Sequence, residues 1–382
     1  MAKFSELFIF KKKSKRKSGD GLSIGEYPFY TSSSRISKYT DEPDYILDDG
    51  LLFGTGGRAS IHYLEGGFSS SGDCFTVTKN PEIELSTKFA YYYFIGNMHL
   101  LDEGFKGAGL KHISKVYIQD IKIPYPPLAE QQKIAAILDA ADSLRQKDQQ
   151  LIDHYTTLSQ SLFLGMFGDP VSNPMGWERT EFGSLIVVLT DYHANGSYEV
   201  LKENVELKSE NDYALMVRTT DLEHNNFDDN VVCISQHAYE YLHKSKVFGG
   251  EIIISKIGSA GKVFLMPYLN RPVSLGMNAF LLRFDNNLNN LFVYYLLTSQ
   301  FGEIEIGKRI KGAVTKTIRK DALREIEIII PPIALQIQFA ERIEAIEAQK
   351  QQAQASLEKS NDLFNSLLQR AFNGELTGSK AA

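Results

Sequence analysis

The chain repeats itself, and this repeat constrains its fold more than any other feature. Pro126-Pro127 open the run Pro-Pro-Leu-Ala-Glu-Gln, and Pro331-Pro332 open Pro-Pro-Ile-Ala-Leu-Gln, a shift of 205 residues. The same shift aligns Lys-Gly-Ala at 106–108 with Lys-Gly-Ala at 311–313, and it still aligns phenylalanines at 167 and 372. A gap-free match over about sixty positions predicts two copies of one structural unit.

Looser matches extend the repeat upstream. Residues 49–57 resemble residues 250–258, and each run places a glycine-rich turn after an apolar stretch. Phe4-Ser-Glu-Leu7 resembles Phe182-Gly-Ser-Leu185, which follows Trp177. Each half therefore contains a variable region, a strand with a glycine-rich turn, a basic glycine loop, another strand, Pro-Pro and a long helix.

The Pro-Pro pairs open the two predicted helices, since proline is tolerated in a first helical turn. Each helix spans about forty residues, or roughly 60 Å at 1.5 Å per residue. The apolar steps of three and four are typical of a coiled coil, with Asp148 on the seam. The row of apolar side chains on each helix would be unstable if it faced water, so we predict that the two helices pack against each other. The predicted stripes are Ile134, Ile137, Ala141, Leu144, Leu151, Tyr155, Leu158 and Leu162 in the first helix, and Phe339, Ile343, Ile346, Ala353, Leu357, Phe364 and Leu367 in the second.

The remaining segments predict an α+β fold. Apolar runs at 51–53, 252–254 and 326–330 are typical of buried strands, whereas 291–297 favours a helix. Residues 169–176 form a predicted linker. The predicted order is a first domain, a central long helix, a second domain, a C-terminal long helix and a flexible tail, at residues 1–124, 125–168, 169–330, 331–374 and 375–382.

Composition limits the setting. The net charge is −6, which permits DNA binding only if basic side chains gather locally. Two distant cysteines, Cys74 and Cys233, favour a reducing cytoplasm. No apolar run reaches membrane-spanning length, so we expect no membrane partner. The lysine-rich segment 11–17 is interpreted as a solvated or disordered arm, with DNA backbone contact as the alternative.

The basic loops are the strongest candidate DNA contacts. Glycines let backbone approach phosphates, and lysines or arginines release counterions. A solvated charged loop is the alternative, but the recurrence in both halves favours DNA contact. The candidates are Lys106, Lys111, His112 and Lys115 in the first half, and Lys308, Arg309, Lys311, Lys316, Arg319 and Lys320 in the second.

The glycine-rich turns at 54–58 and 255–262 are not nucleotide-binding loops. A Walker loop needs four residues between its glycines and then Lys with Ser or Thr, whereas Val263 follows Lys262 here. Arg58, Lys256 and Lys262 are candidate DNA contacts, and plain turns between strands are the alternative.

Signatures of an enzyme are absent, so we predict no catalysis by this chain. We find no Asn-Pro-Pro-Tyr type motif for base methylation and no metal-ligand spacing of histidines or cysteines. Asp191, Glu206 and Lys208 loosely match the set of two carboxylates and one lysine found in some nuclease sites.

The duplicated Pro-Pro-hydrophobe-Ala-x-Gln resembles the specificity subunit HsdS of type I restriction–modification enzymes. Residues 25–32 and 106–113 also resemble its target-recognition domains, and the resemblance covers nearly the whole chain. It implies two domains that each read one half of a bipartite double-stranded DNA site, with antiparallel helices between them that act as a ruler. It also implies docking of two methyltransferase subunits and of restriction subunits. S-adenosylmethionine, ATP and Mg²⁺ would bind those partners, with no cofactor in this chain.

Alternatives remain open at this point. The chain could serve a related methylation-only or phage-defence system, carry an embedded nuclease, or be a coiled-coil adaptor without affinity for DNA.

Overall fold

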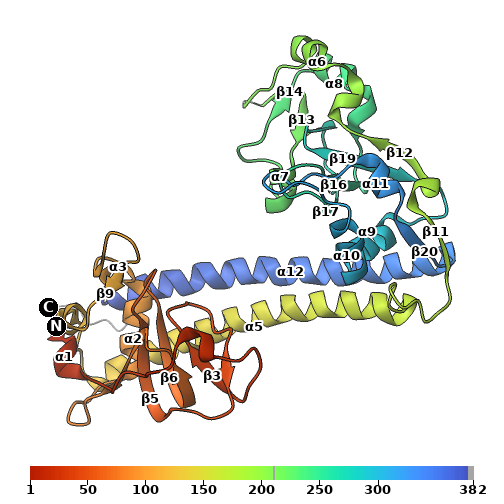
Figure 1. The fold of residues 1–382 in the computed structure, drawn as a ribbon. Coiled ribbons are helices and arrows are strands. Elements are labelled where there is room, and N and C mark those ends of the chain that lie inside the picture. The colour runs from red at the N-terminus through yellow and green to blue at the C-terminus, as the bar shows by residue number, and fades with distance from the viewer. Residues whose placement is uncertain (210, 377–382) are drawn as a thin grey trace. The chain divides into compact units, whose positions relative to one another are not determined.

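A computed structural model describes residues 1–209 and 211–376 (Figure 1). It divides into two compact units, Met1–Leu151 with Ala353–Ala382 (unit 1) and Ile152–Gln352 (unit 2). Most of the predicted tail, residues 377–382, lies outside the described residues. Across the described part of the chain, no helix is both long and apolar enough to cross a membrane.

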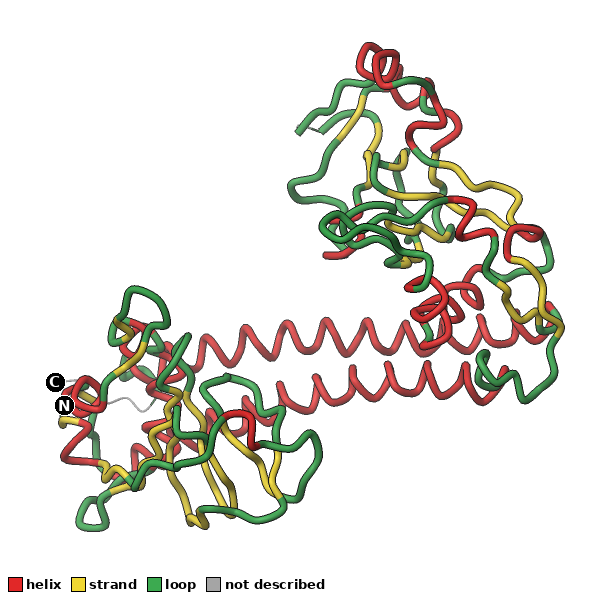
Figure 2. The backbone as a smooth tube through the Cα atoms, viewed as in Figure 1, coloured by secondary structure: helices red, strands yellow, loops and turns green. Residues whose placement is uncertain are grey.

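Unit 1 is built on a six-stranded sheet in the order β2-β7-β5-β6-β3-β4. Its neighbouring strands are antiparallel, except that β3 runs parallel to β6. Figure 2 shows the strands of the protein in yellow and its helices in red. The strands of this unit are β1 (Ala2–Lys3), β2 (Phe8–Phe10), β3 (Tyr27–Tyr30), β4 (Tyr39–Thr40), β5 (Tyr45–Gly54), β6 (Ile61–Ser70), β7 (Cys74–Lys79), β8 (Phe105–Lys106), β9 (His112–Ile113) and β10 (Lys122–Ile123). The shorter helices are α1 (Phe4–Leu7), η1 (Ser18–Asp20), α2 (Thr87–Gly96), α3 (His99–Asp102) and α4 (Lys115–Asp120).

Helix α2 explains why the aromatic-rich stretch 89–94 is apolar on more than one side. Phe94 packs in the sheet core with Phe53, with ring centroids 5.4 Å apart. Phe89 and Tyr92 lie in a second cluster with residues of the long helices. The helix thus lies between two apolar surfaces, and the predicted strand at 51–53 is fully buried within β5.

Unit 2 has two four-stranded sheets, ordered β12-β19-β16-β17 and β14-β13-β18-β15. The predicted strands at 252–254 and 326–330 are confirmed as β16 and β20, and the predicted helix at 291–297 as part of α9. The strands are β11 (Glu178–Glu181), β12 (Ile186–Thr190), β13 (Ala214–Val217), β14 (Cys233–Ile234), β15 (Lys246–Val247), β16 (Ile252–Ser255), β17 (Val263–Leu265), β18 (Val273–Leu275), β19 (Ala279–Phe284) and β20 (Glu327–Ile330). The shorter helices are η2 (Phe182–Leu185), η3 (Tyr192–Asn195), α6 (Tyr198–Asn204), α7 (Thr219–His224), α8 (Gln236–Tyr241), η4 (His243–Ser245), α9 (Asn290–Thr298), α10 (Gln300–Gly307) and α11 (Lys320–Arg324).

Both units open in the same way, which confirms the repeat. In unit 1, β1 pairs antiparallel with β10, and in unit 2, β11 pairs antiparallel with β20. The Phe4 amide donates to the Ile121 carbonyl at 2.8 Å, and the Phe182 amide donates to the Ile326 carbonyl at 2.7 Å. Both phenylalanine side chains are fully buried, so the two opening motifs recognised in the sequence have one structural role.

The long helices are α5 (Leu128–Phe167) and α12 (Ile333–Phe372), each 40 residues long. They pack against each other within each unit. In unit 1 the Arg145 guanidinium lies over the Phe364 ring, and Asp148, one turn further along α5, contacts Ser360, one turn earlier in α12. This order of contacts makes the helices antiparallel there. In unit 2, the rings of Phe163 and Phe339 lie 5.6 Å apart.

The α5 seam differs from the predicted one. Leu144, Leu151 and Leu158 are 44%, 44% and 43% exposed, whereas Ser159, next to Leu158, is buried. Asp148 is buried, as predicted for a seam position. The seam passes one position away from these leucines, so their prediction as buried was wrong. A buried carboxylate needs hydrogen bonds, and neighbouring serines of α12 supply them.

The Asp148 carboxylate accepts hydrogen bonds from the Ser356 hydroxyl at 3.1 Å and the Ser360 hydroxyl at 2.5 Å. The predicted α12 stripe is confirmed at its buried positions Phe339, Ile343, Ala353 and Phe364.

A buried glutamine connects the sheet domain of unit 1 to α5. Gln131 is 0% exposed; its side-chain oxygen accepts from the Ser86 amide at 2.9 Å, and its nitrogen donates to the Pro126 carbonyl at 2.8 Å. Ser86 is the N-cap of α2. The Tyr92 hydroxyl adds a bond to Asp139 of α5 at 2.7 Å, and burial raises the pKa of this tyrosine, which keeps the donor protonated.

Unit 2 repeats this arrangement. Gln336, also 0% exposed, accepts from the amide of Asn289, the N-cap of α9, at 2.9 Å and donates to the Pro331 carbonyl at 2.8 Å. The Tyr295 hydroxyl donates to Glu347 of α12 at 3.0 Å. The repeated Gln of the Pro-Pro motif is therefore a structural latch between each domain and a long helix.

Removing the glutamine latch is predicted to destabilise its own unit. Gln131→Met and Gln336→Met keep the side-chain volume but leave buried backbone groups unpaired, at a cost of about 1–3 kcal/mol each. Thermal unfolding measures the effect, with the exposed neighbours Gln132→Met and Gln338→Met as matched controls. Equal melting temperatures for a latch variant and its control would refute the role.

Candidate nucleic-acid interface

In unit 1 the glycine-rich turn and the basic loop lie side by side. The turn follows β5, and the basic loop connects β8 and β9. The Gly57 amide donates to the Lys111 carbonyl at 3.1 Å, and the Ile113 amide donates to the Thr55 carbonyl at 3.1 Å. Two segments that are far apart in sequence therefore form one surface.

Unit 2 repeats this pairing. The Gly258 amide donates to the Lys316 carbonyl at 3.2 Å, and the Ile318 amide donates to the Lys256 carbonyl at 3.1 Å. The two kinds of segment singled out in the sequence are thus brought together in both units, through the same pair of backbone hydrogen bonds.

A third segment, missed by the sequence analysis, completes each surface. The Thr55 amide donates to the Asp73 carbonyl at 2.9 Å, and the Lys256 amide donates to the Asn278 carbonyl at 2.7 Å. These acceptors lie in the β6–β7 and β18–β19 turns. Gly-Asp and Gly-Met-Asn are turn signals that could have marked these segments, but nothing in the sequence showed their partner.

The basic loops need their first glycine. Gly312 has φ +106°, and a Cβ there would lie 2.1 Å from the Thr315 carbonyl oxygen. Gly107 has φ +144°, and a Cβ there would lie 2.9 Å from the Leu110 carbonyl oxygen. Only glycine fits both the backbone angle and the space, so each loop is closed tightly by its own backbone.

Two predicted DNA contacts of unit 2 are bonded to a buried carboxylate instead of being free. Lys256 and Lys320 lie 3.1 Å and 2.9 Å from the oxygens of Asp191, which is 6% exposed. Burial alone would raise the pKa of Asp191, but hydrogen bonds and charge from the two lysines outweigh it and hold that pKa below its ordinary value. This triad ties the glycine-rich turn and α11 to the end of β12.

Three further predicted cations also have carboxylate partners. Lys262 lies 3.3 Å from Glu223. Lys308 and Arg309 lie 2.6 Å and 2.8 Å from Glu305 of α10. These pairs leave their charges partly neutralised within the unit, which the sequence alone did not reveal.

The other predicted cations are exposed and, among the described residues, have no carboxylate partner in either unit. Lys115 lies over the Phe10 ring at 4.7 Å, and His112 Nδ1 is 3.1 Å from the Thr55 carbonyl oxygen. The exposed cations without such a partner are Arg58, Lys106, Lys111 and Lys115 in unit 1, and Lys311, Lys316 and Arg319 in unit 2.

The N-terminal lysine cluster, residues 11–17, is attached to the unit 1 sheet. The Lys11 amide donates to the Thr76 carbonyl at 2.9 Å, and the Gly72 amide donates to the Arg16 carbonyl at 2.7 Å. The segment is therefore held beside the β6–β7 turn, the third part of the candidate surface, and its lysines are exposed.

Contacts among the described residues do not join the three candidate nuclease residues into one site. Asp191 is engaged by two lysines, and Lys208 pairs with Asp212 at 2.7 Å, whereas Glu206 is exposed. Within residues 1–209 and 211–376, no cluster of three or more His, Cys, Asp or Glu side chains could hold a metal ion.

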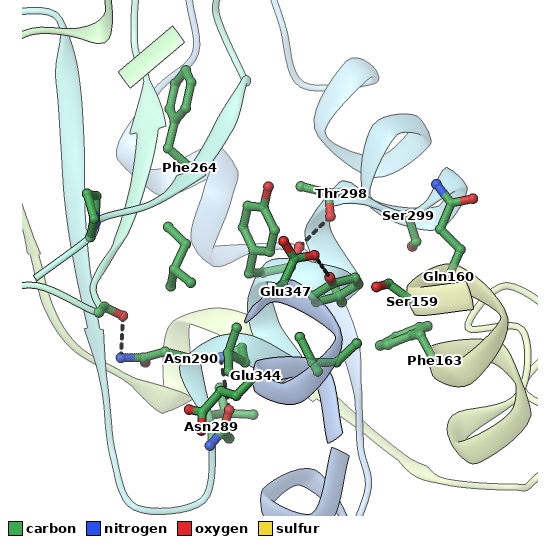
Figure 3. A pocket seen from close by; sticks show the side chains of 18 of the residues that line it. Ser159, Gln160, Phe163, Phe264, Asn289, Asn290, Thr298, Ser299, Glu344 and Glu347 are labelled. Carbon is green, nitrogen blue, oxygen red and sulfur yellow. Dashed lines mark hydrogen bonds between the residues drawn. The ribbon is translucent and has the colours of Figure 1, made fainter. Parts of the chain in front are cut away.

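Unit 2 also contains an open cleft of about 1740 Å³, into which side chains of α5, α9, α12 and β17 project (Figure 3). Phe163 and Phe264 line it together with Glu344 and Glu347. Its charged lining residues are Asp169, Asp285, Glu303, Glu344, Glu347 and Lys350. An acidic lining repels phosphate, so we do not include this cleft in the candidate interface.

Comparisons with known proteins agree with this description. The family model of the type I restriction modification DNA specificity domain matches residues 1–153 and 184–359. The MjaVIII specificity subunit of Methanocaldococcus jannaschii is 24% identical over 350 residues, which cover 85% of this chain and 80% of that protein. The EcoDI specificity subunit of Escherichia coli is 25% identical over 389 residues, which cover 92% of this chain and 83% of that protein.

The fold has a solved counterpart. The crystal structure of a type I restriction-modification S subunit from M. genitalium has a TM-score of 0.63 at 16% sequence identity. The match covers 97% of this chain and 95% of that one, so the likeness of fold extends over both recognition domains and both long helices.

Loss of the Asp191 carboxylate is predicted to destabilise unit 2. Asp191→Asn leaves Lys256 and Lys320 without their partner, at a cost of about 1–3 kcal/mol at neutral pH. Because its folded-state pKa is depressed, the carboxylate stabilises the fold above its unfolded pKa, and this stabilisation is lost as pH falls through the folded pKa. The difference from wild type should hold above about pH 5 and shrink only at lower pH.

Thermal unfolding across this pH range makes the measurement. Asp321→Asn is the control, because that carboxylate is 84% exposed and pairs only at the surface with Arg324. An Asp191→Asn protein as stable as this control at neutral pH would contradict the role of the triad.

Proposed function

The chain belongs to the family of type I restriction modification DNA specificity proteins, and we propose that it selects the target of such an enzyme by reading one DNA half-site with each unit. The observation that carries this proposal is the duplicated three-segment surface, with matching hydrogen bonds at Thr55 and Lys256. Each copy presents exposed lysines without carboxylate partners among the described residues. Positive charge next to a tightly closed glycine loop suits a phosphate backbone.

We propose that this chain supplies recognition and that partner subunits supply the chemistry. Methyl transfer would use S-adenosylmethionine on the methyltransferase subunits, and cleavage would use ATP and Mg²⁺ on the restriction subunits. We propose a cytoplasmic location, which a DNA target favours. The buried free cysteines Cys74 and Cys233 are compatible with it, and burial raises the pKa of Cys74 to about 11, which keeps its thiol protonated.

Co-expression with a methyltransferase subunit tests the proposal directly. Mapping of methylated adenines should return two short specific sequences separated by a fixed spacer of unspecified bases. A single continuous sequence, or methylation without sequence preference, would contradict reading by two units.

We propose that α5 offers part of the docking surface for a methyltransferase subunit. Leu144 and Leu151 are seven residues apart, lie on one face of the helix and are each 44% exposed. Exposed leucines at heptad spacing are costly for a helix that contacts only water, whereas a partner helix would bury them.

The salt dependence of DNA binding should distinguish the free cations from the paired ones. Lys311→Gln and Lys316→Gln should weaken binding to all sequences, and each should reduce the slope of log K against log salt by about 0.9 for one lost phosphate contact. Lys308→Gln should change the slope less, because Glu305 lies 2.6 Å from that ammonium. Wild-type slopes for both Lys311→Gln and Lys316→Gln would reject the loop as a phosphate contact.

Docking on α5 should depend on the exposed leucines. Leu144→Glu with Leu151→Glu should weaken binding of the methyltransferase subunit by at least about tenfold and leave the melting temperature of the chain unchanged. Ser143→Glu with Gln150→Glu is the matched control, since these exposed residues have the same spacing and gain the same charge. Equal subunit affinity for the two double variants, measured by calorimetry, would exclude this face from the interface.

A further inference from the structure

We propose that Val314 and Leu110, the apolar side chains at the tips of the two basic loops, contact base edges in the DNA grooves and thereby contribute to sequence preference. This inference rests on the proposed function, because it assigns the part of each DNA-reading surface that reaches the bases. It assigns phosphate binding to the lysines and contact with bases to the apolar side chain between them.

Exposure of the two tips is the first observation. Val314 is 98% exposed and Leu110 is 77% exposed, although both are large apolar side chains. A single exposed apolar residue is ordinary on a protein surface. Here an exposed apolar side chain occurs in both units, at positions one residue apart within loops of the same form: Lys-Gly-Ala-Gly-Leu-Lys at 106–111 and Lys-Gly-Ala-Val-Thr-Lys at 311–316.

The geometry of the loops is the second observation. In unit 2 the Lys311 amide donates to the Thr317 carbonyl at 2.9 Å, and the Thr317 amide returns a bond to the Lys311 carbonyl at 2.8 Å. In unit 1, Lys106 pairs with His112 as the last rung of the β8–β9 hairpin. Both tips therefore lie beyond a closed backbone ring, and contact at the tip costs little ordering entropy.

Charge around the tips identifies the ligand. Val314 lies between Lys311 and Lys316, and Leu110 lies between Lys106 and Lys111, all exposed and without a carboxylate partner among the described residues. A phosphate backbone that meets these lysines brings the intervening side chain to the groove. Methyl groups there can contact the thymine C5-methyl or pack against base edges. Such contacts differ from one base to another, whereas phosphate contacts are the same for every base.

A protein partner fits these tips less well. Apolar docking sites are contiguous patches, whereas the neighbours of Val314 in the loop are glycine, alanine, threonine and two lysines. One apolar side chain flanked by cations matches the alternation of phosphate and base edge in a groove.

The test uses the full chain assembled with its methyltransferase subunit. After the target has been mapped, the affinity is measured for the target duplex and for duplexes in which each base pair of one half-site is replaced in turn. Val314→Ser should reduce discrimination about tenfold at one or two base pairs of the half-site read by unit 2. It should leave the salt slope and the other half-site unchanged. Leu110→Ser should do the same for the half-site read by unit 1.

Matched controls exist in each unit. Val187 of β12 is 67% exposed, and its neighbour Ile186 pairs with Phe284, whereas the candidate surface adjoins Ala279 at the opposite end of β19. Val187→Ser should therefore have no effect on DNA binding. Ile46 of β5, 79% exposed, serves as Ile46→Ser in unit 1. Val314→Ile keeps an apolar tip and should retain most of the discrimination.

Each other outcome has a definite meaning. If Val314→Ser and Leu110→Ser keep full discrimination, the tips do not read bases and the inference is wrong. If they lose affinity equally for all sequences with a smaller salt slope, the loops contact phosphate only. If they lose the methyltransferase subunit instead, the tips are a protein contact. A wild-type assembly without any sequence preference would refute the proposed function itself.

Discussion

The buried face of each long helix is the constraint on which the rest of the structure depends. The apolar side of a 40-residue helix is unfavourable when it is exposed to water, and in each unit the other long helix buries it. The contact is more specific than hydrophobic burial alone. In unit 1 the seam contains the Asp148 carboxylate with two serine hydroxyls, and such a buried polar group is satisfied only in one register.

The same helices hold the proposed DNA-contact surfaces in place. Gln131 and Gln336 connect the start of each long helix to the N-cap of α2 or α9, and a tyrosine of that helix adds a second bond. The sheets then carry three loops each, joined by backbone hydrogen bonds. Preorganisation of this kind reduces the entropy lost on binding, which favours the proposed contacts of the exposed lysines with phosphate.

The sequence predicted the larger features because they repeat or follow a period. Duplication identified the domain openings, the glutamine motif and the paired basic segments. It could not predict which leucines of α5 are buried, because Leu144, Leu151 and Leu158 and the residue after each of them fit the same steps of three and four around Asp148. Nor could it show that Lys256 and Lys320 share Asp191, since those partners lie 65 and 129 residues apart along the chain. Ion pairs between distant segments arise only from the fold.

Exchange of one recognition domain is the most direct test of the central claim that each unit reads its own half-site. Residues 169–330 would be replaced by the corresponding region of a relative with a different target, and adenine methylation would be mapped after co-expression with the methyltransferase subunit. The account predicts a target in which one half-site changes, while the other half-site remains. A folded, active chimera that changes both half-sites, or neither, would contradict it.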